Sequence, residues 1–332
     1  MRRLLHKAYY DFFFYTGISK NILNKQQKNR KVILTYHNVL PSTEIGPYYT
    51  NFVDVSKDVF QFHIKTLLKN FNIQPASKIL NPSCNGIFLS FDDGMSNNMD
   101  IVHPILSRNG ITAMFAVCSG LLNGEIDFIW RDQIFLLLQN LMNKKIFFPE
   151  LSTNSSSEIS STNLNQVALE LTNFIQTNKK MDIVYQYLEE IKAINNIRIE
   201  KNQVNRSRYL PMSLDEVKLL SKLGHFVVSH THTHRKLSML SADQILFELK
   251  TSKTFLSQNI SECNTIVYPY GTSAEVNGIV RGLTKETGYE YAFMNCNNNI
   301  KNDLSIPRIS MGNLNSKEKF FGVLSGLNKI FQ

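Results

Sequence analysis

The nine residues GIFLSFDDG (86–94) join a short apolar run to two adjacent carboxylates and a glycine. An apolar run of this length, ended by Gly94, is typical of a buried strand. Asp92 and Asp93 are therefore predicted where a buried strand passes into a loop.

A second stretch, HTHTH (230–234), follows the strand-like residues 224–229. The i, i+4 spacing predicts that His230 and His234 lie one helical turn apart, so that both imidazoles reach one ion. Two imidazoles and one carboxylate oxygen, with positions left for water, are typical of a hydrolytic divalent metal site.

The composition is that of a globular protein, with 43% hydrophobic and 19% charged residues among 332. This length suits one large α/β domain with an insertion, or two domains. No stretch approaches the length of a transmembrane helix. The four cysteines (Cys84, Cys118, Cys263 and Cys296) form no CxxC pair, which favours small core residues in a reducing, cytoplasmic compartment.

The net charge of +9 is concentrated at the start of the chain. Residues 1–31 hold eight Lys and Arg against Asp11, a net charge of +7, which leaves +2 for the remainder. No basic stripe or zinc finger follows residue 31, so we expect no nucleic-acid partner.

Residues 1–30 are expected to form a separate basic, aromatic segment. Arg2 and Arg3 precede apolar residues as in a signal peptide, but Asp11 interrupts the run and no small-residue cleavage site follows. Aromatic residues flanked by cations suit a helix lying on the inner membrane face. Packing of these aromatic residues on the domain is an equal alternative.

From residue 31 to 332 the pattern indicates one α/β domain with an insertion. Predicted strands and helices alternate, which favours a parallel sheet or a (β/α) barrel. Residues 121–209 break the alternation with helices and a Ser/Thr/Asn-rich tract, which predicts a mainly helical insertion. The predicted strands are 32–37, 86–90, 112–118, 224–229, 265–270, 289–293 and 305–311. Ser213 and Glu216 resemble a capping box and predict the start of a helix over 214–223.

Four motifs in order, SFDDG (90–94), HTHTH (230–234), VYPYG (267–271) and IPRIS (306–310), resemble those of the NodB-homology polysaccharide deacetylases, a carbohydrate esterase family. LTYHNV (34–39) and IPRIS point to its surface-polysaccharide biosynthesis branch. The resemblance covers about residues 31–311 without the insertion. It implies a distorted (β/α) barrel with fewer than eight regular strands and with its active site at the C-terminal ends of the strands.

The resemblance also implies roles for individual residues. Asp93, His230 and His234 match the metal ligands, and zinc is the expected ion. Asp92 matches the general base, and Tyr270 matches the position whose backbone N–H holds the oxyanion.

The sequence departs from the family pattern at two places. No histidine follows His234, so the general acid of the usual Leu-x-His motif is absent, and His37 is our candidate replacement. No arginine precedes YPYG, and Arg308 is our candidate to orient Asp92 and keep it ionised.

Substrate contacts are predicted within the same motifs. Tyr36, Pro269 and Tyr270 are candidates, and Trp130 could stack on a sugar ring. Packing at the start of a helix is an equal alternative for Trp130.

Together these features predict a metal-dependent hydrolase that removes an N-acetyl group from an amino sugar of a polysaccharide or lipid-linked glycan. O-deacetylation or hydrolysis of another amide is an alternative within the class. The alternative outside it is a carbohydrate-binding protein that keeps the metal without turnover, and Asp92 argues against that role.

Overall fold

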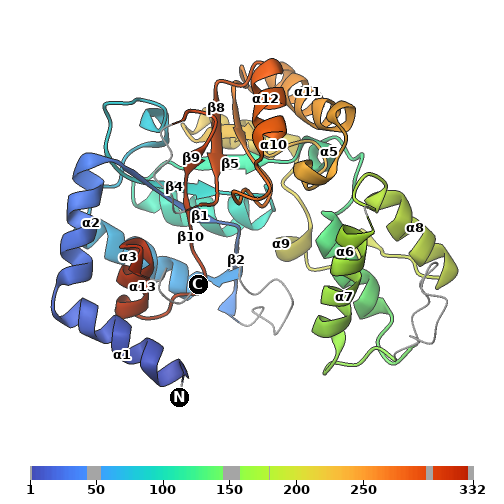
Figure 1. The fold of residues 1–332 in the computed structure, drawn as a ribbon, viewed down its shortest axis with the longest axis horizontal. Helices are drawn as coiled ribbons and strands as arrows, with labels where there is room; N and C mark the ends of the chain where they lie inside the picture. Colours follow the sequence, from blue (N-terminus) through green and yellow to red (C-terminus); the bar gives the residue numbers. More distant parts are fainter. Residues whose placement is uncertain (1, 43–53, 145–157, 179, 297–301, 328–332) are drawn as a thin grey trace.

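A computed structural model describes residues 2–42, 54–144, 158–178, 180–296 and 302–327 (Figure 1). A sheet of eight strands forms its centre, and every pairing in the sheet is parallel, in the order β10-β1-β4-β5-β6-β7-β8-β9. The strands of this sheet are β1 (Lys31–Tyr36), β4 (Gly86–Phe91), β5 (Met114–Val117), β6 (Phe226–Ser229), β7 (Thr265–Val267), β8 (Tyr291–Met294), β9 (Ile306–Pro307) and β10 (Ile309–Ser310). A second parallel sheet pairs β2 (Asn38–Leu40) with β3 (Asp54–Ser56).

The two edges of the large sheet meet at Arg308. β9 pairs with β8 and β10 pairs with β1, so the chain crosses from one edge to the other within a single residue. The sheet thus becomes a nearly closed barrel, and the predicted (β/α) barrel fold is confirmed. The strand predicted over 305–311 is instead two short strands, because the chain changes partner strand at Arg308.

Side chains inside the barrel come from every second residue of consecutive strands, as strand geometry requires. The interior cluster consists of Ile33, Phe88, Met114, Ala116, Val228, Val267 and Phe293, with Ile79. Ser90 and Asp92 follow Phe88 at intervals of two, and His37 follows Ile33 at an interval of four. These polar groups therefore continue the interior face toward the C-terminal ends of the strands.

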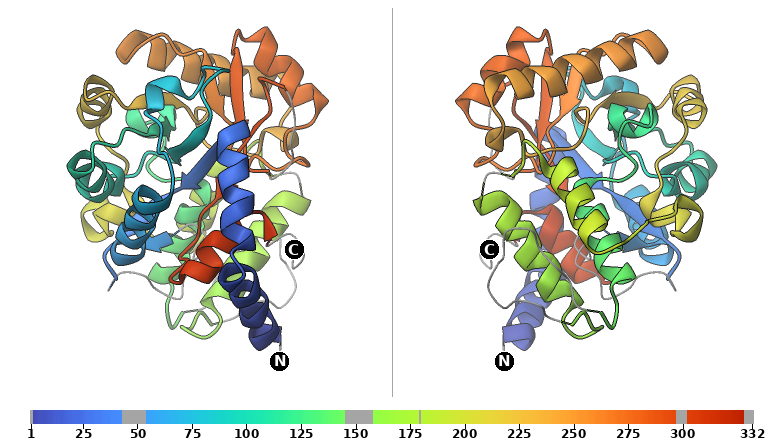
Figure 2. Two further views of the ribbon diagram at one scale, coloured as in Figure 1. Left: turned by 90° about the vertical axis from the view of Figure 1, so that its left-hand side faces the viewer. Right: turned by 90° about the vertical axis from the view of Figure 1, so that its right-hand side faces the viewer.

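Helices lie around the outside of the barrel (Figures 1 and 2). The capping box predicted at Ser213 and Glu216 begins α10, and a second capping box begins α11. The surrounding helices are α3 (Lys57–Asn70), α4 (His103–Arg108, preceded by a π-helical turn at Asn98–Val102), α10 (Leu214–Lys222), α11 (Ala242–Asn259), α12 (Gly278–Glu286) and α13 (Lys317–Leu324). Short 3-10 turns lie at Ala76–Lys78, Lys201–Gln203 and Leu237–Met239.

Between β5 and β6 the chain forms a helical lobe, on the right of Figure 1. Its helices are α5 (Ser119–Leu122), α6 (Trp130–Asn140), α7 (Leu164–Thr177), α8 (Val184–Ile194) and α9 (Arg206–Tyr209). The lobe has a hydrophobic cluster of its own, centred on Trp130 and Leu137. The Ser/Thr/Asn-rich tract was predicted as a loop over 152–165, and its first six residues lie outside the described residues. Its remainder forms a turn and the start of α7, a helix that was not predicted.

The chain begins with α1 (Arg2–Tyr15) and α2 (Ile18–Asn29), on the left of Figure 1. α1 packs against α13, where the Tyr10 ring lies so close to Gly322 that a side chain there would clash with it. The Phe14 and Phe321 rings add a contact with centroids 5.4 Å apart. Within the described ranges, no helix combines the length and apolar character needed to cross a bilayer.

Candidate active site

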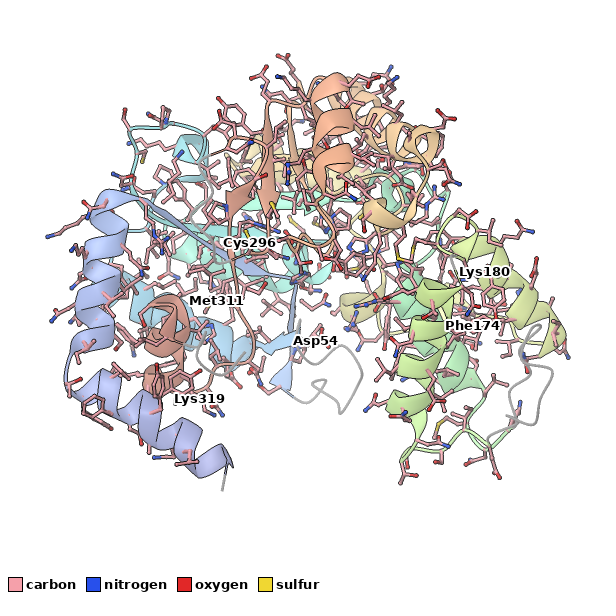
Figure 3. The ribbon with its side chains drawn as sticks, viewed as in Figure 1. Asp54, Phe174, Lys180, Cys296, Met311 and Lys319 are labelled. Carbon is pink, nitrogen blue, oxygen red and sulfur yellow. The ribbon has the colours of Figure 1, made fainter. Side chains whose placement is uncertain are left out.

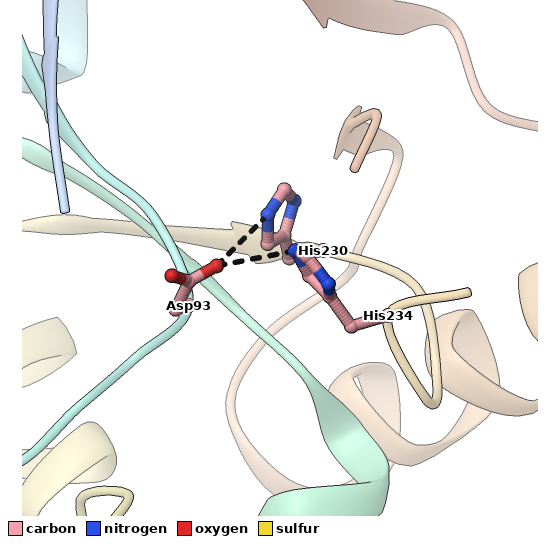
Figure 4. Close-up of side chains that lie close together, drawn as sticks. All are labelled: Asp93, His230 and His234. Atoms are coloured by element: carbon pink, nitrogen blue, oxygen red, sulfur yellow. Dashed lines mark ion pairs between the residues drawn. The ribbon is translucent and has the colours of Figure 1, made fainter. Parts of the chain in front are cut away.

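Asp93, His230 and His234 come together from two loops at the C-terminal end of the barrel (Figure 4). Asp93 Oδ1 lies 3.4 Å from His230 Nε2 and 3.2 Å from His234 Nε2. One potential ligand atom from each residue lies within 4.8 Å of the other two. This donor set suits a borderline divalent cation such as zinc.

One buried atom of the cluster is consistent with a bound cation. Asp93 Oδ1 has no hydrogen-bond partner in the described part of the chain, although such groups are normally paired. Burial raises the pKa of Asp93, but His230 and His234 outweigh it and hold that pKa well below its usual range. Asp93 is therefore ionised, as a ligand must be, and these residues fit a divalent ion.

The histidine loop has a different conformation from the helical turn that the spacing suggested, so that local prediction is wrong. Residues 230–234 form a loop with left-handed φ angles of 64° at Thr231 and 58° at His234. Asp93 (φ 73°) and Tyr270 (φ 62°) have the same unusual conformation. Non-glycine residues seldom adopt it, and such strain gathers at functional sites where surrounding contacts hold it in place.

A hydrogen bond orients His230 in this loop. Its Nδ1 donates to the Val267 carbonyl at 2.8 Å, which leaves the Nε2 lone pair directed toward Asp93.

Glu248 of α11 is the main buried anchor of the same loop, and the sequence reasoning missed it. Its Oε2 accepts hydrogen bonds from the backbone N–H groups of His232 (3.0 Å) and Thr233 (2.7 Å). Its Oε1 accepts from Arg235 Nε at 2.9 Å and also from the Thr233 hydroxyl. The available signal was a carboxylate on the buried stripe of α11, beside Ile245 and Leu249.

His232 also holds the loop in place. It is fully buried, with Nε2 2.8 Å from Glu125 Oε2 and Nδ1 2.8 Å from Ser119 Oγ. Gly120 donates its N–H to the His232 carbonyl at 2.8 Å, so the start of α5 supports the loop from the insertion side.

Asp92 pairs with Arg308. Arg308 Nη1 and Nη2 donate to Asp92 Oδ1 and Oδ2 at 2.7 and 2.8 Å, a bidentate pair. Ser90 and Asn295 accept from the same guanidinium group. Burial raises the pKa of Asp92, but Arg308 outweighs it and lowers that pKa. Asp92 is therefore an ionised carboxylate in a fixed orientation.

Replacing Arg308 with Lys tests this positioning role. Lysine cannot form the bidentate pair, so we expect kcat to fall about 10–100-fold, with KM much less affected. Steady-state turnover measured at several substrate concentrations gives both constants. Arg206→Lys, on an exposed arginine, should leave both unchanged. Wild-type kcat in Arg308→Lys would rule the role out.

His37 lies beside the same carboxylate. Its Nε2 is 3.8 Å from Asp92 Oδ2, and its backbone carbonyl accepts from Asn98 Nδ2 at 3.1 Å. Its side chain keeps 17% of its surface exposed, so it can meet a bound substrate as well as Asp92.

Tyr270 lies next to His234, and the centroids of the two rings are 5.2 Å apart. Gly271 donates its N–H to the Pro269 carbonyl at 2.7 Å in a tight turn around Tyr270. The Tyr270 N–H makes no hydrogen bond to any described residue. An oxyanion requires an unpaired N–H donor, and this role of Tyr270 stays a prediction.

Two predicted substrate contacts are wrong. Tyr36 and Trp130 are fully buried and have no surface to present to a glycan. Tyr36 faces outward from β1, where its hydroxyl lies 3.2 Å from His63 Nδ1. Trp130 packs in the core of the insertion, which was the alternative for it. Pro269 is buried and Tyr270 is partly exposed, and their contact with substrate stays a prediction.

A model of the family described as "Polysaccharide deacetylase" matches residues 163–292. This segment contains both histidines of the cluster and Tyr270, but it begins after Asp92 and Asp93. The two aspartates therefore lie outside the matched segment, and the structure places Asp93 next to both histidines. A comparison with curated protein sequences gave no match.

Several solved structures share the fold at low sequence identity. A de-N-acetylase from Aggregatibacter actinomycetemcomitans is 15% identical with a TM-score of 0.55, covering 89% of this chain and 100% of that one. The deacetylase PplD from Streptococcus pyogenes, in complex with acetate, is 16% identical with a TM-score of 0.53, covering 89% and 98%. IcaB from Ammonifex degensii is 13% identical with a TM-score of 0.51, covering 89% and 97%.

Proposed function

We propose that the chain is a member of the polysaccharide deacetylase family, whose model matches residues 163–292, and that it is a metal-dependent hydrolase that removes an N-acetyl group from an amino sugar. The observation that supports the proposal is that two adjacent carboxylates have different partners. Asp93 faces two imidazoles, and Asp92 is held by Arg308. One carboxylate is thus a ligand, and its neighbour remains available for proton transfer.

Asp93, His230 and His234 would hold the cation, for which we propose zinc. A bound divalent ion supplies Lewis-acid polarisation of the acyl carbonyl and of water. The hydrogen bond from His230 to Val267 and the contacts of Glu248 keep the imidazoles in place for this purpose.

The other residues carry the proton transfers. Asp92 accepts a proton from the attacking water as the new C–O bond forms. The oxyanion that develops accepts a hydrogen bond from the Tyr270 N–H. His37 then donates a proton to the sugar nitrogen as the C–N bond breaks, which releases acetate and an amino sugar.

The role of His37 as general acid is tested by His37→Gln. We expect turnover to fall about 10²-fold or more, because the leaving nitrogen loses its proton donor. Activity on an activated aryl acetate, whose leaving group needs no proton, should fall much less. His63→Gln changes a histidine bound to Tyr36 in the core and is a control for stability. Near-normal deacetylation by His37→Gln would exclude this role.

The substrate bond is tested by acetate release from three acceptors: N-acetylglucosamine oligomers, lipid-linked N-acetyl sugars and O-acetylated glycan. Release from an N-acetyl acceptor supports the proposal. Release from the O-acetylated glycan alone would favour the ester alternative, since the same groups can act on an ester. Metal binding without release from any acceptor would favour binding without turnover.

We also propose a cytoplasmic location. All four cysteines lie unpaired in the described chain, which suits a reducing compartment. Cell fractionation with an antibody against the protein tests this proposal, and recovery from an extracytoplasmic fraction would contradict it.

A further inference from the structure

The first helix carries a second apolar face that the fold does not use. The inner face of α1 packs Tyr10 and Phe14 against α13. On the outer face, Leu5 is 63% exposed and Phe12 is 59% exposed. Seven residues apart, these two lie on the same side of the helix, turned away from Tyr10 and Phe14.

Tyr15 extends this outer face and is 75% exposed, although its hydroxyl donates to Glu318 at 3.3 Å. In all three views α1 projects from the body of the molecule toward its N-terminal end (Figures 1 and 2). No described residue covers Leu5, Phe12 or Tyr15 to the extent that a folded core would.

Exposed cations lie on the same N-terminal segment as the outer face and on the neighbouring helix α13. The side chains of four lysines on α1 and α2 are exposed, and the one acidic group of this segment, Asp11, pairs with Lys7 at 2.7 Å. α13 adds two exposed lysines and the acidic Glu318 beside α1, and Figure 3 labels Lys319 there. The exposed lysines are Lys7, Lys20, Lys25, Lys28, Lys317 and Lys319.

The positive charge of this segment favours an anionic partner for the outer face over a second copy of the protein. In a two-fold dimer through α1, the positively charged N-terminal segments of two copies would come together, and like charges in such an interface are unfavourable. An anionic bilayer attracts the lysines and admits aromatic and aliphatic side chains at the headgroup level. We propose that the outer face of α1 docks this protein on an anionic membrane surface.

Vesicle flotation of the full chain tests the proposal. The vesicles are phosphatidylcholine alone, or equal parts phosphatidylcholine and phosphatidylglycerol. We expect binding to the anionic vesicles, little binding to the neutral ones, and release at high salt. Leu5→Ser/Phe12→Ser should weaken binding about 10-fold or more, because both apolar side chains lose their place in the bilayer.

The matched control is Leu223→Ser/Ile279→Ser, which removes two apolar side chains that are 46% and 65% exposed far from α1 in the sequence. This variant should float as the wild type does. Lys20→Gln/Lys25→Gln should weaken anionic binding independently of the apolar face. Thermal melting shows that each variant is folded.

Three outcomes would overturn the proposal. The first is a wild type that does not float with anionic vesicles, and the second is equal flotation of wild type and Leu5→Ser/Phe12→Ser. The third is a dimer in light scattering that dissociates in that variant, since a second copy would then occupy the face. None of these measurements uses acetate release, so they stand apart from the proposed deacetylation.

Discussion

Asp92→Asn is expected to lower acetate release about 10³–10⁴-fold while leaving the bound metal in place. The amide cannot accept the proton of the attacking water, so the step that forms the C–O bond loses its base. The metal ligands are untouched, because the carboxylate of Asp92 pairs with Arg308 and that of Asp93 faces the imidazoles.

The measurement pairs initial rates of acetate release with the metal content of the purified protein. Asp243→Asn changes an exposed aspartate on α11 and should match the wild type in both. A second comparison, His234→Ala, should lose metal and activity together. Asp92→Asn with wild-type turnover, or with its metal lost, would contradict the assignment of this residue as a base rather than a ligand.

Glu248→Ala is expected to lower the free energy of unfolding by about 3 kcal/mol, more than any other substitution proposed for this protein. Truncation leaves the backbone N–H groups of His232 and Thr233 buried without an acceptor, and it leaves Arg235 without its carboxylate. The loop that carries both histidine ligands loosens, so metal affinity should also fall about 10–100-fold.

Urea denaturation and a competitive zinc titration measure the two effects. Glu248→Gln keeps one acceptor oxygen and should fall between wild type and Glu248→Ala. Glu286→Ala removes an exposed carboxylate from α12 and should change neither quantity. Wild-type stability of Glu248→Ala would show that the loop holds its strained φ angles without this anchor.

The sequence could predict what is encoded within a few neighbouring residues. The apolar run before Asp92 indicated a strand, and Ser213 with Glu216 indicated a helix start, because these signals depend on local periodicity and capping. The alternation of strands and helices indicated a parallel sheet or a (β/α) barrel, and the family resemblance implied the barrel. The motifs also named the carboxylates and histidines that the structure brings together.

Predictions about surroundings were less successful, because burial depends on residues distant in the sequence. Tyr36 and His37 are neighbours in the chain, yet one faces the helices and the other faces the site. Strand alternation explains this only once the barrel interior is known. Trp130 is buried by helices of the insertion that are distant from it in the sequence.

The sequence by itself thus determined the chemical groups and the class of fold. The tertiary structure alone decided how the groups are paired. Arg308 reaches Asp92 across 216 residues because the barrel closes at Arg308. Glu248 holds the histidine loop because α11 packs behind it, and the loop keeps left-handed backbone angles that its sequence would not choose alone. Pairing of residues so far apart in the sequence follows from closure of the barrel and packing of its helices. Neither can be predicted from a local sequence pattern.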